Sequence, residues 1–320
     1  MHTSFNAYVV SIVFQASGAA FALADGTVRF ESGEVIEAHK GAVLSAAAHP
    51  SGVGVVTGGD DGRLVWSRPE GPVVLFDGRG KWLDAVAASP ESGLIALAAG
   101  RELIVLDAKD RSFERRFAHT RTVADVTFDP KGRRIATATY GAVMLWYARI
   151  ADQKPQALNW AGAHNRAIFS PDGRFVLSAM QENDLHGWRL SDMKDLRMAG
   201  YPGKIRSMSF MSKGALMATS GAPGVVIWPF AGANGPMGKE AVEVGVDENS
   251  LVTQCAGAQM GSRLIAGRSD GRVWSADLAV TGDRPLRETK GSAVSAVAMT
   301  SDGRRAAFGD EDGEAAVIDL

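Results

Sequence analysis

The chain has 320 residues, of which 46% are hydrophobic and 22% are charged, a balance typical of a globular protein with a large buried core. Its 34 basic and 36 acidic residues give a formal net charge of -2 without any block of like charge, so the composition indicates neither a nucleic-acid nor a membrane partner. The single cysteine, Cys255, excludes an internal disulfide. This fits a reducing compartment, and we expect a cytoplasmic protein.

The first expected elements lie in an apolar region near the N-terminus. Residues 8–14 are mostly apolar, and residues 21–24 with the following Asp25 resemble a signal-peptidase site. A secretory signal also carries Lys or Arg ahead of its apolar stretch, and residues 1–7 contain neither. We therefore interpret the region as two strands, with secretion or a periplasmic location as the alternative. No stretch of the sequence reaches the ~18 apolar residues that a membrane span needs.

From these strands onward one template recurs along the chain. It consists of an apolar strand with alternating side chains, a turn ending in Gly, a second apolar strand, a tight turn that often reads Asp-Gly, and a third strand. The eight copies, which we number repeats one to eight, have first turns ending at Gly18, Gly52, Gly93, Gly132, Gly173, Gly214, Gly261 and Gly303. The spacing averages about 40 residues, close to the length of one four-stranded propeller blade.

Repeat four shows the template most clearly. Strand-like residues 123–128 precede the turn Asp129-Pro130-Lys131-Gly132, and residues 134–139 and 142–146 follow as the next two strands. Proline at the second turn position fixes φ, and glycine at the last position tolerates a positive φ. A weaker and often more polar fourth strand follows in most repeats, and no segment has a sustained helical period. The pattern predicts an all-β fold.

The repeats resemble the WD-repeat family over nearly the whole chain. In that family the third strand ends in Trp-Asp, and a His, a Ser or Thr, an Asp and the Trp form a hydrogen-bonded tetrad within a blade. Here the dipeptide is degraded, as in Trp66-Ser67 and Trp146-Tyr147. The resemblance implies two partial tetrads, one from His39, Thr57 and Asp60 or Asp61, and one from His119, Thr137 and Trp146.

The resemblance also implies a closed β-propeller of four-stranded antiparallel blades, which would form a single domain over residues 1–320. We expect eight blades. Seven is the alternative, if repeat one or the longer step that contains residues 231–235 does not form a full blade. The chain ends on the third strand of repeat eight, so residues 1–6 are the candidate for the strand that closes the last blade. Closure of this kind removes an exposed sheet edge.

Enzyme motifs are absent from the sequence. It has no phosphate-binding loop, no Gly-x-Ser-x-Gly elbow, no Cys-x-x-Cys and no His-Glu-x-x-His, and we expect no catalytic residues, cofactor or metal. The alternative is a propeller hydrolase or lactonase-like enzyme that uses Asp84 and Asp125, in the first strands of repeats three and four. Two acids there could bind a metal or perform acid–base chemistry. Arg166 and Arg206, in the next two first strands, could instead neutralise them.

The resemblance favours a platform or scaffold that binds a partner protein or peptide on one loop face. In the family this face is built from the loops before the first strand and between the second and third strands. Aromatic and Arg side chains commonly anchor protein interfaces. The predicted contact residues are Trp82, Arg121, Tyr140, His164, Arg166, Tyr201 and Lys204. An acidic or extended peptide would suit this set, whereas nucleic acid is not an expected partner because the chain lacks a strong positive stripe.

Overall fold

The computed structural model describes residues 1–280 and 282–320, and nearly all regular structure in them is β-strand. The one helical element in this part of the chain is the short 3-10 turn η1 (Ser212–Gly214). The all-β prediction is therefore confirmed. Two compact units divide the chain: residues 1–12, 182–185 and 196–320 form one, and residues 13–181 and 186–195 form the other. None of the described helices has the length and apolar character needed to cross a membrane.

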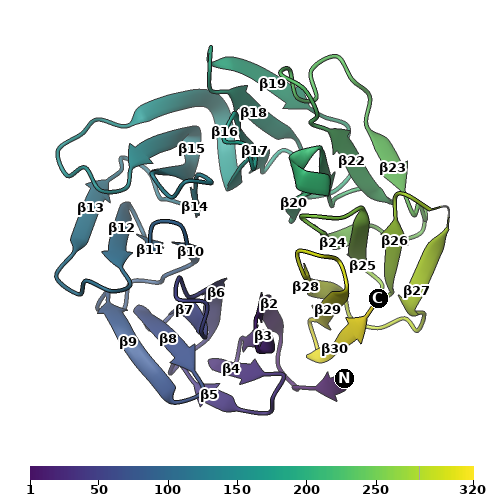
Figure 1. Cartoon of the computed structure of the whole chain (residues 1–320), viewed down its shortest axis with the longest axis horizontal. Coiled ribbons are helices and arrows are strands. Elements are labelled where there is room, and N and C mark those ends of the chain that lie inside the picture. The colour runs from purple at the N-terminus through teal and green to yellow at the C-terminus, as the bar shows by residue number, and fades with distance from the viewer. Residues whose placement is uncertain (281) are drawn as a thin grey trace. The chain divides into compact units, whose positions relative to one another are not determined.

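The first three repeats each fold into a four-stranded antiparallel sheet, with strands ordered as in the sequence (Figure 1). Repeat one contains β2 (Val9–Gln15), β3 (Gly18–Leu23), β4 (Thr27–Phe30) and β5 (Val35–Glu37). Repeat two contains β6 (Val43–Ala48), β7 (Val55–Gly59), β8 (Arg63–Arg68) and β9 (Gly71–Asp77). Repeat three contains β10 (Ala85–Ser89), β11 (Leu94–Ala99), β12 (Glu102–Asp107) and β13 (Glu114–Ala118).

The last three repeats also build four-stranded sheets. Repeat six contains β20 (Met208–Met211), β21 (Leu216–Thr219), β22 (Val225–Pro229) and β23 (Val242–Val244). Repeat seven contains β24 (Val252–Gly257), β25 (Arg263–Arg268), β26 (Val273–Asp277) and β27 (Asp283–Arg287). Repeat eight supplies β28 (Val294–Met299), β29 (Arg305–Asp310) and β30 (Glu314–Asp319), to which β1 (His2–Ser4) is added.

The expectation of eight four-stranded blades is wrong, because the described strands form seven sheets, six of four strands and one of six. Repeats four and five share the six-stranded sheet, which consists of β14 (Asp125–Phe128), β15 (Arg134–Tyr147), β16 (Gln156–Phe169), β17 (Phe175–Met180), β18 (Leu185–Arg189) and β19 (Lys194–Met198). The cause is the length of β15 and β16, which have 14 residues each.

Local geometry explains why β15 and β16 are so long. β15 continues through the expected turn at Tyr140 and Gly141 as a bulge, with a register shift between Tyr140 and Ala142 and a positive φ of 87° at Gly141. β16 is both the last strand of repeat four and the first of repeat five, since neither proline nor an Asp-Gly turn interrupts residues 156–169. The sequence suggested that a blade could be lost at repeat one or at residues 231–235. The lower number of sheets arises at neither place.

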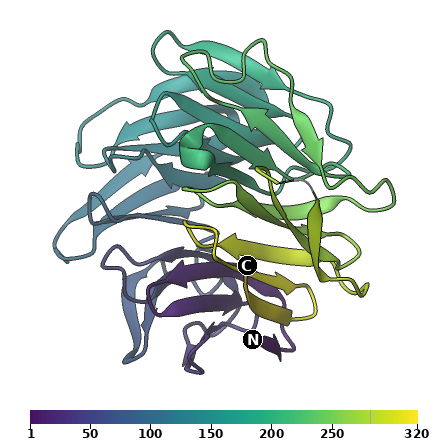
Figure 2. The same ribbon diagram turned by 45° about the vertical axis from the view of Figure 1, so that its right-hand side comes forward.

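Strand β1 completes the sheet of repeat eight from the other end of the chain. It pairs antiparallel with β30, with His2 opposite Ala316 and Ser4 opposite Glu314. The Phe5 side chain is buried, and its backbone N–H donates to Gly313 O at 2.9 Å. The two ends of the chain therefore lie side by side in Figures 1 and 2, where the purple β1 borders the yellow C-terminal strands. Residues 2–4 cover what would otherwise be an open edge of β30.

The second strand of most repeats forms the centre of the core. All residues of β3, β7, β11 and β17 are buried, on both faces of their sheets. Apolar clusters bridge neighbouring sheets; one joins Val56 and Leu64 of repeat two to Leu83, Ile95 and Leu97 of repeat three. Since each sheet is covered on both faces, the loops at the ends of the strands are held by a rigid framework.

Candidate binding surface

The loops lie at the two ends of the strands in each sheet. At one of these ends, hydrogen bonds join the loops of neighbouring repeats into a continuous edge. The Leu83 N–H, ahead of β10, donates to Gly59 O at 3.1 Å, and the Val123 N–H, ahead of β14, donates to Gly100 O at 2.9 Å. Each of these bonds attaches a loop before a first strand to a turn between second and third strands. The two kinds of loop that were expected to build the binding face therefore lie together in repeats two to four.

Four of the predicted contact residues lie between positions 82 and 166 and are exposed on this edge. Trp82 precedes β10 and is 64% exposed, and Tyr140, at the bulge of β15, is 65% exposed. Arg121 lies in the loop between β13 and β14, and Arg166 lies in the first-strand part of β16; both are exposed. We call these four residues the aromatic-basic surface. Lys204, also exposed, lies ahead of β20 in the other unit.

The two acids of the enzyme alternative interact with each other, and Asp125 also lies close to Arg166. Burial raises the pKa of Asp125; the positive charge of Arg166 opposes this rise, and the negative charge of Asp84 adds to it. The pKa of Asp84 is also raised by burial. Asp125 Oδ2 accepts the Ala167 N–H at 2.9 Å, which fixes its carboxylate against the neighbouring strand β16. Within the described ranges no three His, Cys, Asp or Glu side chains come together as a metal site requires.

His164 and Tyr201 are not surface residues, so their assignment as partner contacts is wrong. His164 is 1% exposed; its Nε2 lies 3.1 Å from Trp160 O and its Nδ1 lies 2.8 Å from Ser178 Oγ. A carbonyl oxygen only accepts, so Nε2 carries the proton and Nδ1 accepts from the serine. Tyr201 is 8% exposed, and burial raises its pKa to about 12. Both side chains bind their partners inside the protein.

The two partial tetrads form, and the structure selects one of the two aspartates that were open for the first. His39 Nε2 lies 2.8 Å from Thr57 Oγ1, and His39 Nδ1 lies 2.9 Å from Asp61 Oδ1. The acid is therefore Asp61 and not Asp60. Burial works to raise the pKa of Asp61, but hydrogen bonds from His39 and from the backbone N–H groups of Arg63 and Lys40 outweigh it and lower the pKa.

The tetrad of repeat four lacks an acid and contains a neutral histidine. His119 Nε2 lies 2.9 Å from Thr137 Oγ1 and accepts the Trp146 Nε1–H at 3.1 Å, while His119 Nδ1 donates to Phe117 O at 3.0 Å. Burial lowers the pKa of His119, which favours the neutral ring that this pattern requires. The network stabilises the blade, and its polar atoms are used internally.

Tyr201 takes the place of the tetrad histidine in repeat six. Its hydroxyl lies 2.7 Å from Thr219 Oγ1 and accepts the Trp228 Nε1–H at 2.6 Å. The separation from the aromatic acceptor to the threonine is 18 residues here, as it is for His119 and Thr137, and the separation to the tryptophan is 27 residues in both repeats. This spacing is a signal in the sequence that identifies Tyr201 as structural.

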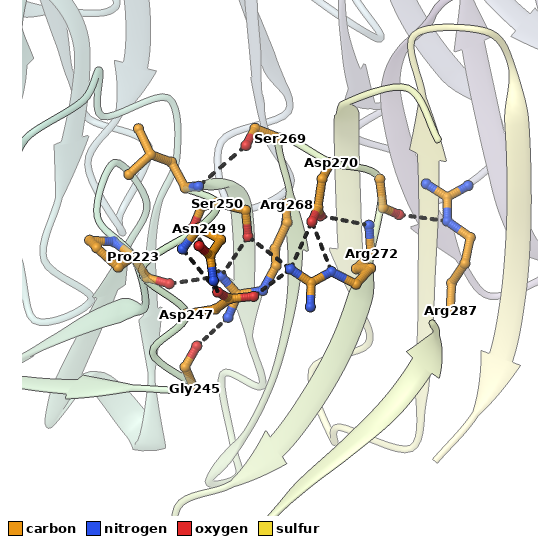
Figure 3. Close-up of polar contacts among 12 residues, drawn as sticks. Pro223, Gly245, Asp247, Asn249, Ser250, Arg268, Ser269, Asp270, Arg272 and Arg287 are labelled. Carbon is orange, nitrogen blue, oxygen red and sulfur yellow. Dashed lines mark hydrogen bonds and ion pairs between the residues drawn. The ribbon is translucent and has the colours of Figure 1, made fainter. Parts of the chain in front are cut away.

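Repeat seven contains a polar network that the sequence did not predict (Figure 3). Arg268 is 5% exposed; its Nη1 donates to Pro223 O at 2.8 Å and to Ser250 O at 3.2 Å, and its Nη2 donates to Gly245 O. Arg272 Nε donates to Asp270 at 2.8 Å, and its Nη2 donates to Asp247. The two arginines thus tie the loop between β23 and β24 to β25 and to the turn that follows it.

Comparisons with known proteins agree with this architecture. The family model described as "WD domain, G-beta repeat" matches residues 31–66 and 111–147. These segments hold the His39 and His119 clusters, respectively. Together with the sheets, these matches support a WD-repeat β-propeller. The predicted family resemblance is therefore confirmed, and the fold suggests a scaffold for protein–protein interaction.

Two individual proteins are similar to this chain. "Pre-mRNA-processing factor 19" from Oryza sativa subsp. japonica is 22% identical over 248 residues, which are 74% of this chain and 46% of that protein. The chain thus matches about half the length of this curated relative. A crystal structure of the computationally designed Ika8 protein aligns with a TM-score of 0.79 at 19% identity, covering 99% of this chain and 98% of that chain. At this identity the structural likeness concerns the fold alone.

Proposed function

We propose that the protein is an interaction platform that binds an extended segment of a partner protein on the aromatic-basic surface. The single observation that carries the proposal is the exposure of Trp82 and Tyr140, at 64% and 65%, on an edge that also presents Arg121 and Arg166. Large exposed aromatic side chains are enriched in protein interfaces, and arginine is frequent among the residues that dominate binding.

The charges of the surface favour a partner with at least one acidic residue. Arg121 forms no ion pair within the part of the chain that is described, so its charge is available to a carboxylate. The charge of Arg166 is partly offset by Asp125. The rigid sheets hold Trp82 and Tyr140 in position before binding, and tryptophan and tyrosine have few rotatable bonds, so little conformational entropy is lost when they are covered.

The hydrolase alternative has less support from the residues around Asp84 and Asp125. The neighbouring Arg166 favours a charge-neutralised Asp125 over a ligand for a cation, and the Asp125 carboxylate already accepts a backbone N–H. A non-enzymatic role therefore remains part of the proposal. A cytoplasmic location stays a prediction.

Affinity purification from native cell extract tests the proposal. The wild-type protein is compared with Trp82→Ala/Arg121→Ala and with the control Val53→Ala/Arg304→Ala, whose side chains are also exposed. We expect a partner that the wild type and the control retain and the first variant loses, with Kd about tenfold or more weaker for the purified pair. Equal retention by all three folded proteins, or no protein retained by the wild type, would contradict the proposal.

A further inference from the structure

A groove lies at the opposite ends of the strands that carry the aromatic-basic surface. Trp82 precedes β10, whereas this groove is built from the turn that follows β10, the corresponding turn of repeat four and the end of β15. Its volume is about 650 Å³. Binding pockets for small ligands typically have volumes of about 300–1,000 Å³, so the groove has room for a few amino-acid side chains.

Hydrogen bonds hold the walls of the groove in place. Arg149 Nη2 donates to Asp107 Oδ2 at 2.8 Å and to Ser92 O at 3.2 Å, which joins repeat four to repeat three. The Gln153 side chain accepts the Tyr147 N–H at 2.8 Å and donates to Tyr147 O and Ile150 O, each at 2.7 Å. The segment that ends β15 is therefore fixed before any partner binds, which lowers the entropic cost of binding.

The groove combines an apolar floor with an excess of positive charge. Tyr147 is 54% exposed and Ile150 is 50% exposed, and both line the groove. Three cations, Lys131, Arg133 and Arg149, stand against one acid, Glu91. Arg149 is neutralised by Asp107, whereas Lys131 and Arg133 form no ion pair with any residue in the described ranges. Two positive charges that form no ion pair therefore flank exposed apolar surface, and Glu91 is the one acid among the lining residues.

We propose that this groove binds an acidic segment of a partner protein. An apolar side chain of the segment covers Tyr147 and Ile150, and its carboxylates lie near Lys131 and Arg133. Charge complementarity identifies the occupant, since a basic or neutral segment would leave both cations uncompensated. The groove uses none of the residues of the aromatic-basic surface, so the protein has two docking surfaces at opposite ends of its strands, and either can fail without the other.

A selection from a display library of ten-residue peptides on the immobilised full chain tests the proposal. The wild type is compared with Lys131→Glu/Arg133→Glu, with Lys131→Gln/Arg133→Gln, and with Trp82→Ala/Arg121→Ala. We expect the pool to contain a set of peptides, rich in Asp and Glu around one large apolar residue, that is lost with the first two variants and kept with the third. The proposal is overturned if no acidic set is lost on the changes at Lys131 and Arg133, or if every acidic peptide is lost with the third variant.

The most enriched acidic peptide, labelled with fluorescein, then gives the size of the effect by fluorescence anisotropy. We expect Kd to rise about tenfold with Lys131→Glu/Arg133→Glu. The Kd of the wild type should also rise with salt, because the contacts are solvent-exposed ion pairs. Lys213→Glu/Arg304→Glu, in repeats six and eight, makes the same change in net charge and should leave Kd unchanged. An equal loss with this control would show a general charge effect and overturn the assignment to the groove. Tyr147→Ser should also weaken binding, and unchanged affinity there would exclude contact with the floor.

Discussion

Repeats four and seven satisfy buried polar groups at the loop edge in two different ways. In repeat four, neutral side chains bind one another, with His119 between Thr137 and Trp146. In repeat seven, the buried cation of Arg268 binds the backbone carbonyls of Pro223, Ser250 and Gly245. The segments that the family model matches include repeat four and not repeat seven, so the Arg268 network lies outside the matched segments.

The difference matters because the two networks fail differently. Removing one neutral partner leaves one or two hydrogen bonds unmade, and a net cost of about 1 kcal/mol each is usual. Removing a buried cation that serves several carbonyls takes a donor from each of them at once in a low-dielectric interior, where each group left unsatisfied costs about 1–3 kcal/mol. Repeat seven therefore depends more strongly on a single side chain than repeat four does.

The largest expected effect is that of Arg268→Ala. The substitution leaves the carbonyl oxygens of Ser250 and Gly245 without their donor, while Pro223 O keeps the Asp247 N–H at 3.2 Å. It also removes a side chain that is 5% exposed, so the free energy of unfolding should fall by about 3 kcal/mol. Urea denaturation followed by tryptophan fluorescence measures it. The control Arg304→Ala, at a side chain 82% exposed, should change stability by less than ~0.5 kcal/mol. If both variants cost the same, the contrast between the two networks does not hold.

A smaller loss of stability is expected from changes at Tyr201. Repeat six resembles repeat four in this respect, because Tyr201 also binds neutral side chains. Tyr201→Phe removes the acceptor for the Trp228 Nε1–H and the partner of Thr219, so it should cost about 1–2 kcal/mol. Tyr201→His should cost less, because His119 makes the equivalent contacts at the same spacing. Thermal unfolding of both variants measures the difference. Equal losses would mean that the hydrogen bonds of Tyr201 contribute little and that its ring volume decides.

Much of the fold could be predicted from the sequence because its determinants are local. Asp-Gly turns and turns ending in Gly mark where strands end, and alternation of apolar residues marks which segments are strands. The join between repeats four and five could not be predicted in this way. Tyr140-Gly141 is equally compatible with a hairpin turn and with a bulge, and the pairing of β15 with β16 decides between them.

The candidate surface was predicted in part, for a similar reason. Trp82 and Tyr140 are exposed where loop positions placed them, but His164 and Tyr201 are buried, because exposure depends on whether Ser178 and Thr219 approach them in three dimensions. Arg268 left no signal, since its acceptors are backbone carbonyls that any residue carries. A hydrogen bond between two side chains requires two residue types at a fixed separation, which can be found in the sequence. A hydrogen bond to a backbone carbonyl requires no particular residue type and cannot be found in this way.

The smallest expected effect is a difference in pH dependence between repeat two and repeat seven. Burial, together with the charge of Arg111, lowers the pKa of His49 in repeat two to about 4, below the value of about 6.5 in an unfolded chain. The unfolded state therefore binds a proton first as pH falls, and stability is lost between pH 6.5 and 4. Asp247 in repeat seven has a pKa of about 2, set by hydrogen bonds from Asn249 and Arg272, so its contribution persists until pH falls below about 4.

Hydrogen exchange at pH 7 and pH 5 measures this difference amide by amide. At pH 5 the amides of β7 and β8, beside His49, should lose about 1 kcal/mol of protection, and those of β25 should keep theirs. His49→Gln should remove most of the loss, because glutamine does not titrate. If the loss at β7 and β8 persists in this variant, His49 is not its source, and the predicted difference between repeats two and seven does not hold.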